Sequence, residues 1–156
     1  MATRIQGLRE LNRKMKAIPP AAKAAARKAV VQGAEEIAAI QRTHAPVDEG
    51  DLKDSIHVTL PGQTTPPYSQ PGGSRTAGPE EALVTAGNTK VRTAHLVEFG
   101  TKAHIAGGIF EGALIPDIPA QPFFWPGYRA VRKRVRSRVT REINKAIKAA
   151  ATGGGT

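Results

Sequence analysis

The chain has 156 residues and carries 23 Lys and Arg against 13 Asp and Glu, which gives a net charge of +10. It has no cysteine, which excludes disulfide scaffolds and cysteine-based metal sites, and it has no apolar run of the roughly 20 residues that a membrane span needs. The length fits one domain, alone or with an appendage, and the first residues lack the apolar stretch of a secretory signal, so we expect a soluble protein of intracellular type.

The basic residues are concentrated at the two ends of the chain. Residues 1–45 have a net charge of +6 and residues 123–156 one of +8, whereas residues 46–122 have a net charge of −4. Such a basic composition is typical of proteins that bind nucleic acids or acidic surfaces. The separation of the charges also predicts attraction between the acidic middle and the basic ends, within one chain or between copies.

Two helices are predicted at the N-terminal end. Residues 4–17 carry apolar side chains at helical spacing, and Pro19-Pro20 ends this helix because proline disfavours the α conformation in the residue before it. A second helix is predicted over about 20–43, with Pro20 in its first turn. Its apolar face is rich in small residues, which let another backbone approach closely, and consists of Ala26, Val30, Gly33, Ala34, Ile37, Ala38 and Ile40.

A turn and a strand follow. Residues 48–50 read Asp-Glu-Gly, a turn signal, and Asp51 is a candidate cap for a short helical turn that carries Leu52. The acidic residues here lack the ligand spacing of a calcium loop, so a turn with a cap is the better interpretation. Residues 55–60 then alternate, with Ile56, Val58 and Leu60 on one side, which predicts a half-buried strand.

The middle of the chain is irregular. Residues 61–79 contain five Pro and four Gly, so we expect no regular element but an extended or mobile excursion between strands. Residues 81–87 alternate Ala82, Val84 and Ala86 and predict a second strand. Residues 90–99 fit a strand or a short helix, and residues 100–121 read as loop with brief pairing near Ile105 or Ile109-Phe110.

The last predicted element is a helix from Pro126 to about Ala150, roughly 37 Å long. Since that length exceeds what a small sheet can cover, we expect its C-terminal half to project or to meet a partner. The aromatic cluster before it favours a hydrophobic plug over an anchor between subunits. The cluster is Phe123, Phe124, Trp125 and Tyr128, and the helix continues it with a stripe of Val131, Val135, Val139, Ile143 and Ile147.

No pattern of residues indicates catalysis. The sequence has no P-loop, no dinucleotide fingerprint and no nucleophile elbow, and its histidines lack metal-ligand spacing. We therefore predict that the protein is not an enzyme and that it binds no metal and no cofactor. The basic side chains of the last helix favour a solvated face over phosphate contact, and no aromatic residues interleave with them for single-strand stacking. The histidines are His44, His57, His95 and His104.

Three segments in a fixed order resemble a known family. The first runs from Pro46 to Ile56, the second reads AHLVEFGT over residues 94–101, and the third reads PAQPFFWP over residues 119–126 and leads into the long charged helix. Together they resemble the small tail-component family of Hong Kong 97-like siphophages, of the gene product ten type. The resemblance covers roughly residues 20–150.

The resemblance implies a structural virion protein without catalytic activity. It implies a ring of six or twelve copies in the phage neck, which joins head and tail, contacts adjacent neck or tail proteins and lets genomic DNA pass without sequence-specific binding. It also implies that the protein contacts no membrane and is located in the host cytoplasm before assembly. The alternatives are a tail terminator that caps the tail tube, or a basic architectural DNA-binding protein.

The motif residues have expected scaffold roles. We expect Asp48 and Gly50 to build a tight turn, Leu52 and Ile56 to face the core, and Phe99 to be an apolar anchor before a sharp turn. Charges at core sites are costly, so Leu52→Asp and Phe99→Asp are each expected to abolish folding. The full set of motif residues is Pro46, Asp48, Gly50, Leu52, Ile56, Glu98, Phe99, Gly100, Pro119, Pro122 and Phe123.

The predicted architecture is a single α+β domain over residues 1–151, with residues 152–156 as a flexible tail. It has N-terminal helices, a small antiparallel β-sheet and a long C-terminal helix. We expect the last helix to meet acidic surfaces of neighbouring subunits, and its charge-reversed variants to assemble poorly while the monomer stays folded. DNA in the channel is the competing partner. The candidate interface residues are Tyr68, Trp125, Arg134, Arg138 and Arg141.

Overall fold

The computed structural model describes residues 20–152, and within them it confirms the α+β class. The first predicted helix, over 4–17, lies outside the described residues, as does most of the predicted tail. The elements are α2 (Pro20–His44), α3 (Asp51–Asp54), β1 (His57–Thr59), β2 (Leu83–Thr85), α4 (Ala94–Phe99), β3 (His104–Ile105), the 3₁₀ helix η1 (Gly108–Phe110), β4 (Leu114–Ile115) and α5 (Phe124–Thr152).

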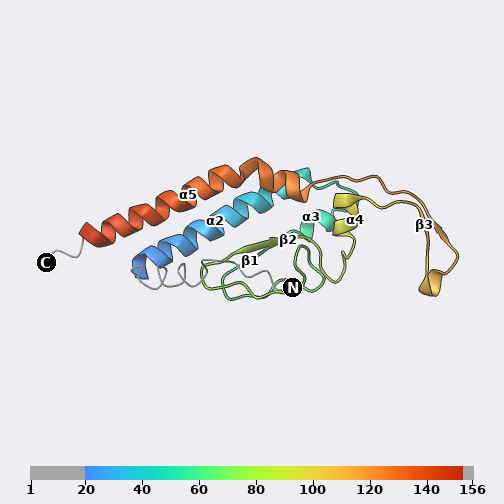
Figure 1. Cartoon of the computed structure of the whole chain (residues 1–156), viewed down its shortest axis with the longest axis horizontal. Helices are drawn as coiled ribbons and strands as arrows, with labels where there is room; N and C mark the ends of the chain where they lie inside the picture. Colours follow the sequence, from blue (N-terminus) through green and yellow to red (C-terminus); the bar gives the residue numbers. More distant parts are fainter. Residues whose placement is uncertain (1–19, 153–156) are drawn as a thin grey trace, which may run out of the picture.

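The two long helices form one layer of an elongated molecule. Helices α2 and α5 lie side by side and antiparallel, and the β1–β2 sheet with its loops lies against α2 (Figure 1). The chain between α4 and α5 leaves this body and projects from one end of it. Within residues 20–152, no helix is both long enough and apolar enough to span a membrane.

Small residues let α2 and α5 approach closely, as predicted. A Cβ atom built on Gly127 of α5 would lie 3.1 Å from the Cα of Gln41 on α2, and one built on Gly33 of α2 would collide with the side chain of Val135. The larger members of the predicted face, such as Ile37, are only half-buried. The buried residues of α2 are Ala22, Ala26, Ala29, Gly33, Ala34, Ala38 and Gln41.

The apolar stripe of α5 becomes more exposed along the helix. Val131 and Val135 are buried, Val139 and Ile143 are half-buried, and Ile147 is 37% exposed. Most of α5 nevertheless runs alongside α2 and not alongside the sheet (Figure 1), so only its end extends beyond the helix beside it.

The sheet has two short antiparallel strands, where longer ones were predicted. Val58 lies opposite Val84, and both are close to the core that α2 covers. The predicted alternation is wrong at its end: Thr59 is fully buried, whereas Leu60 is 37% exposed. Strand β1 stops before Pro61, which has no N–H to continue the ladder, so Leu60 already belongs to the loop.

Residues 61–79, for which we expected an extended or mobile excursion between strands, fold back on themselves between β1 and β2. The N–H of Thr65 donates to the carbonyl of Arg75 and that of Ala77 to the carbonyl of Gln63, both at 2.8 Å. Gln70 exchanges two backbone hydrogen bonds with Ala86, next to β2. The prolines have no backbone N–H to donate, but the residues between them donate enough backbone hydrogen bonds to form an irregular hairpin.

The segment that does project is residues 101–118, which we call the arm. Strands β3 and β4 pair antiparallel, with His104 opposite Ile115, and a bridge between Thr101 and Ile118 closes the base. Helix η1 forms the tip. The sequence predicted loop here with brief pairing, and the paired strands are indeed only two residues long.

Candidate functional site

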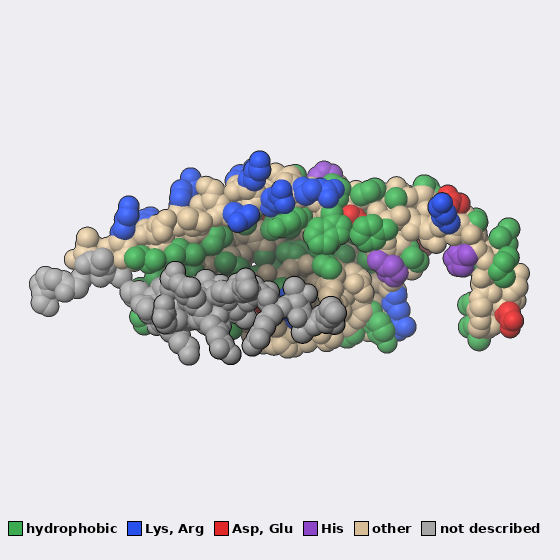
Figure 2. Space-filling view, viewed as in Figure 1, with side chains coloured by type: hydrophobic (Ala, Val, Ile, Leu, Met, Phe, Trp, Pro, Cys, Tyr) green, Lys and Arg blue, Asp and Glu red, His purple; other side chains and the backbone are tan. Residues whose placement is uncertain are grey.

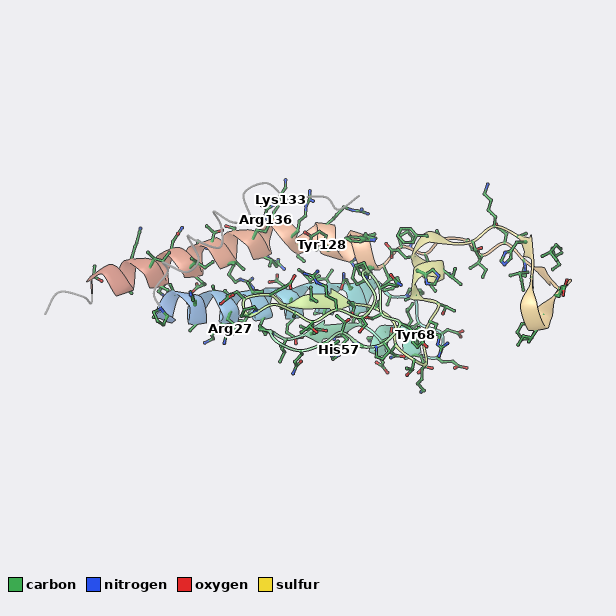
Figure 3. All side chains as sticks on the ribbon, turned by 60° about the horizontal axis from the view of Figure 1, so that its bottom comes forward. Arg27, His57, Tyr68, Tyr128, Lys133 and Arg136 are labelled. Atoms are coloured by element: carbon green, nitrogen blue, oxygen red, sulfur yellow. The ribbon has the colours of Figure 1, made fainter. Side chains whose placement is uncertain are left out.

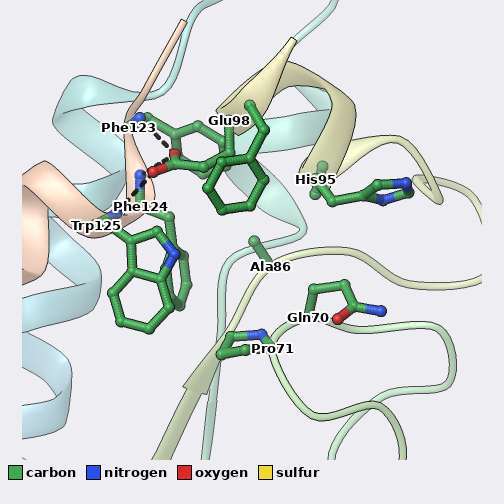
Figure 4. Close-up of a pocket in the computed structure, with 10 residues that line it drawn as sticks. Gln70, Pro71, Ala86, His95, Glu98, Phe123, Phe124 and Trp125 are labelled. Atoms are coloured by element: carbon green, nitrogen blue, oxygen red, sulfur yellow. Dashed lines mark hydrogen bonds between the residues drawn. The ribbon is translucent and has the colours of Figure 1, made fainter. Parts of the chain in front are cut away.

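A buried carboxylate connects α4 to the start of α5. The Glu98 side chain is 5% exposed, and its Oε2 accepts hydrogen bonds from the N–H groups of Phe123 and Phe124, both at 2.8 Å. Its Oε1 accepts a third from the N–H of Trp125 at 3.1 Å (Figure 4). The first N–H groups of a helix have no partner inside it, and the helix dipole favours a negative charge there. Glu98 therefore caps α5 from a distant element.

The base of the arm is held tightly beside this cap. Gly100 has φ of 69°, and a Cβ atom on it would lie 2.7 Å from the carbonyl oxygen of Ile118 and 2.8 Å from the nitrogen of Ala120. The N–H of Gln121 donates to the carbonyl of Val97 at 2.8 Å. Gly100 is thus required both for its conformation and for space, which confirms the predicted sharp turn.

Phe99 is not the core anchor that the sequence predicted. It is 68% exposed, whereas Ala94 and Glu98, four residues apart on α4, are buried. On a helix the residue after an inward one is rotated by about 100°, so Phe99 turns away from the core. The expected burial of Phe99 is therefore wrong, and we now expect the Phe99→Asp variant to fold.

The turn before α3 follows the prediction with one correction. Gly50 has φ of 89° and occupies the cap position of α3 without a side-chain hydrogen bond, so Asp51 begins the helix and does not cap it. Ile56 is 2% exposed and Leu52 packs against the core at its edge, as expected. The Oγ of Ser55 accepts from the N–H of Gly87 at 3.1 Å and ties this turn to the end of β2.

The aromatic cluster forms a plug with one open side. Phe123 and Phe124 are 1% and 7% exposed, which confirms the plug for these two residues, and edge-to-face contacts continue through Trp125 to Tyr128. Trp125 is half-buried and lines a cavity of about 140 Å³. We call it the apolar pocket (Figure 4). Its other walls include Gln70, Pro71, Ala86, His95, Phe99 and Phe124.

Two of the predicted interface arginines are engaged inside the chain. Arg134 and Arg138, one turn apart on α5, both bind the carboxylate of Glu36 on α2, the latter at 2.6 Å. Burial raises the pKa of Glu36, but the hydrogen bonds and charges of the two arginines outweigh it and leave that pKa below its ordinary value. The expectation that reversing these arginines impairs assembly but leaves the monomer folded stays a prediction, and the loss of both contacts with Glu36 is now expected to lower the stability of the monomer as well. The signal in the sequence was the pair of adjacent acids on α2, Glu35 and Glu36, together with arginines four residues apart on α5.

A different set of basic residues faces outward. Arg129, Arg132, Lys133 and Arg136 are exposed and follow one another at helical spacing, and we call them the basic face. Lys and Arg side chains line the outer side of α5 (Figure 2), and those of Lys133 and Arg136 point away from α2 (Figure 3). Arg141 is also exposed.

The other candidate residues lie apart from one another. Tyr68 is 55% exposed, and the guanidinium of Arg92 stacks over its ring at 4.0 Å. Pro119 and Pro122 are exposed in the chain that returns from the arm, and Pro46 is half-buried. Among residues 20–152, no three histidine or acidic side chains are grouped as ligands for a metal ion.

The comparisons with known proteins concern the first part of this structure. The family model described as "Bacteriophage HK97-gp10, putative tail-component" matches residues 9–100. That range contains α2, the turn at Gly50, both strands of the β1–β2 sheet and α4 with Glu98, and it ends before the arm. No curated protein and no solved structure matches the chain.

Proposed function

We propose, since the chain belongs to the bacteriophage HK97-gp10 tail-component family, that it acts where the tail meets the head. Family membership supports a structural component of the phage tail, and therefore a place in the virion. The finer proposal is a ring of six or twelve copies that surrounds the DNA channel and joins head to tail.

The observation that carries the ring is the separation of opposite charges on one body. The basic face lies along α5, whereas exposed acidic side chains gather around the turn that leads into α3. Two different complementary surfaces on one chain favour head-to-tail association, which closes into a ring when the rotation between copies allows it. The acidic side chains are Asp48, Glu49, Asp51 and Asp54.

Of the two partners for the basic face, we favour the acidic turn of a neighbouring copy over DNA. Charge pairs across an interface steer assembly and fix its register more than they add affinity. The neck DNA would then pass by without sequence readout. Arg134 and Arg138 have a different role in this proposal, because they hold α2 and α5 together in each copy.

The double variant Lys133→Glu/Arg136→Glu tests the proposal, because both side chains are exposed and point away from α2. The matched control is Lys28→Glu/Lys148→Glu, which makes the same charge change at exposed positions outside the basic face. Assembly is measured by the mass of the purified protein, and head–tail joining and DNA retention are measured in particles.

We expect the basic-face variant to melt like the wild type but to lose assembly and head–tail joining, while the control keeps both. Intact assembly with lost DNA retention would instead show that the basic face lines the channel. Particles that join heads to tails without this protein would refute the proposed function altogether.

A further inference from the structure

The tip of the arm presents large apolar side chains to solvent. Ile109 is 92% exposed and Phe110 is 66% exposed, and behind them on the ribbon Ile105 and Leu114 are 64% and 69% exposed. A two-stranded ribbon is marginally stable by itself in water. Clustered apolar side chains at the end of a projecting ribbon indicate a surface that a partner covers.

The apolar pocket has the size and chemistry to receive one such side chain. Its volume of about 140 Å³ is close to the roughly 150 Å³ of a protein cavity that binds benzene. Its walls are the rings of Phe124 and Trp125 and the methyl group of Ala86, while Gln70 and His95 lie toward its rim (Figure 4). A phenyl ring fits this space and these walls.

The arm of the same chain does not fill this pocket. Phe99, the last residue of α4, lines the pocket, and the arm starts two residues later and leads away from the body (Figure 1). Ten residues of extended chain, from Thr101 to Phe110, span at most about 35 Å. Figure 1 shows the tip at the end of the arm that points away from the body, so the tip is open to contact with a neighbouring molecule.

We infer that the arm of one copy inserts Phe110 into the apolar pocket of the next copy. The inference rests on the proposed ring and names the contact that builds it. Tip and pocket are different surfaces present once in every chain, so the contact is head-to-tail and repeats from copy to copy. The charges favour this pairing. Glu111 places a negative charge next to Phe110 at the tip. Arg92, which stacks on Tyr68, places a positive charge near Gln70 at the rim of the pocket.

Thiol cross-linking tests the contact directly, because the chain has no cysteine of its own. Ile109→Cys, which keeps Phe110 at the tip, and His95→Cys are made in separate full-length chains that differ in mass by a tag, and the mixture is treated with a short bis-maleimide. The control partner is Val47→Cys, which sits at an apolar position 73% exposed and outside the pocket.

We expect the Ile109→Cys chain to cross-link to the His95→Cys chain several-fold more than to the Val47→Cys chain. Equal cross-linking to both partners, or a dominant product between two Ile109→Cys chains, would overturn the inference. A wild-type chain that stays monomeric at every concentration would overturn it as well.

The second measurement separates this inference from the proposed function. Phe110→Ser is expected to melt like the wild type but to lose the high-mass assembly, whereas Val47→Ser keeps it. If Phe110→Ser still forms complete rings that join heads to tails, the arm contact is wrong while the proposed function stands. If wild-type rings depend on Phe110 but particles join without the protein, the contact stands and the proposed function fails.

Discussion

Replacing Glu98 by glutamine removes a negative charge from a side chain that accepts three backbone hydrogen bonds. The carboxylate is buried and accepts three N–H groups from the first turn of α5. A glutamine has nearly the same shape, but only one of its two terminal atoms is an acceptor. In either orientation, therefore, the side-chain NH₂ group of the glutamine faces a backbone N–H group that the carboxylate had accepted from.

The expected loss of stability follows from the contacts. A buried donor left without a partner costs about 1–3 kcal/mol, and the Glu98→Gln variant leaves at least one. Removing the negative charge from the helix N-terminus costs about 0.3–2 kcal/mol more. We expect a total of about 2–4 kcal/mol, a large part of the roughly 5–15 kcal/mol that stabilises a domain.

Equilibrium urea unfolding measures this difference, with the slope of the transition compared between variants to check that the unfolded state is unchanged. The matched control is Glu35→Gln, an exposed position on α2 where the same chemical change is expected to stay within about 0.5 kcal/mol. A Glu98→Gln protein as stable as the control would refute the capping role.

Three further predictions concern the packing of the body. The pKa of Glu36 is lowered in the folded state, so its contribution to the free energy of unfolding is complete above the ordinary pKa of 4.5 and is lost as the pH falls through the lowered pKa. The difference in stability between the wild type and Glu36→Gln is therefore expected to become smaller in acid. Thermal melts of both proteins at a series of pH values measure this difference. Gly127→Ala places a methyl group 3.1 Å from the Cα of Gln41 and is expected to cost about 1–3 kcal/mol in urea unfolding. Leu52→Asp should give a protein without a cooperative melt while Phe99→Asp melts like the wild type, and the reverse result would mean that α4 is rotated in solution.

Periodicity was sufficient for the long elements. The small residues of α2 and the apolar stripe of α5 recur over several turns. The bounds of both helices could therefore be predicted to within a few residues, and the face that packs inward could be identified. The close packing at Gly33 follows from the same reasoning, because a glycine on an otherwise apolar helix face makes room for a neighbouring element, here the side chain of Val135.

Short elements and long-range polar contacts could not be predicted in the same way. Helix α4 has six residues, too few to separate a strand from a helix, and this uncertainty hid which of Glu98 and Phe99 faces inward. The arm has strands of two residues with no periodicity. The partners of Glu98 and Glu36 depend on how distant elements are placed, which is set by packing and not by local spacing.

The root of the arm determines how the molecule carries mechanical load. Both strands of the arm enter the body at one point, where Gly100 and Ala120 are in close contact and Gln121 is bonded to Val97. Tension on the tip is therefore delivered to α4 and, through Glu98, to the first turn of α5, and it bypasses the two-stranded sheet.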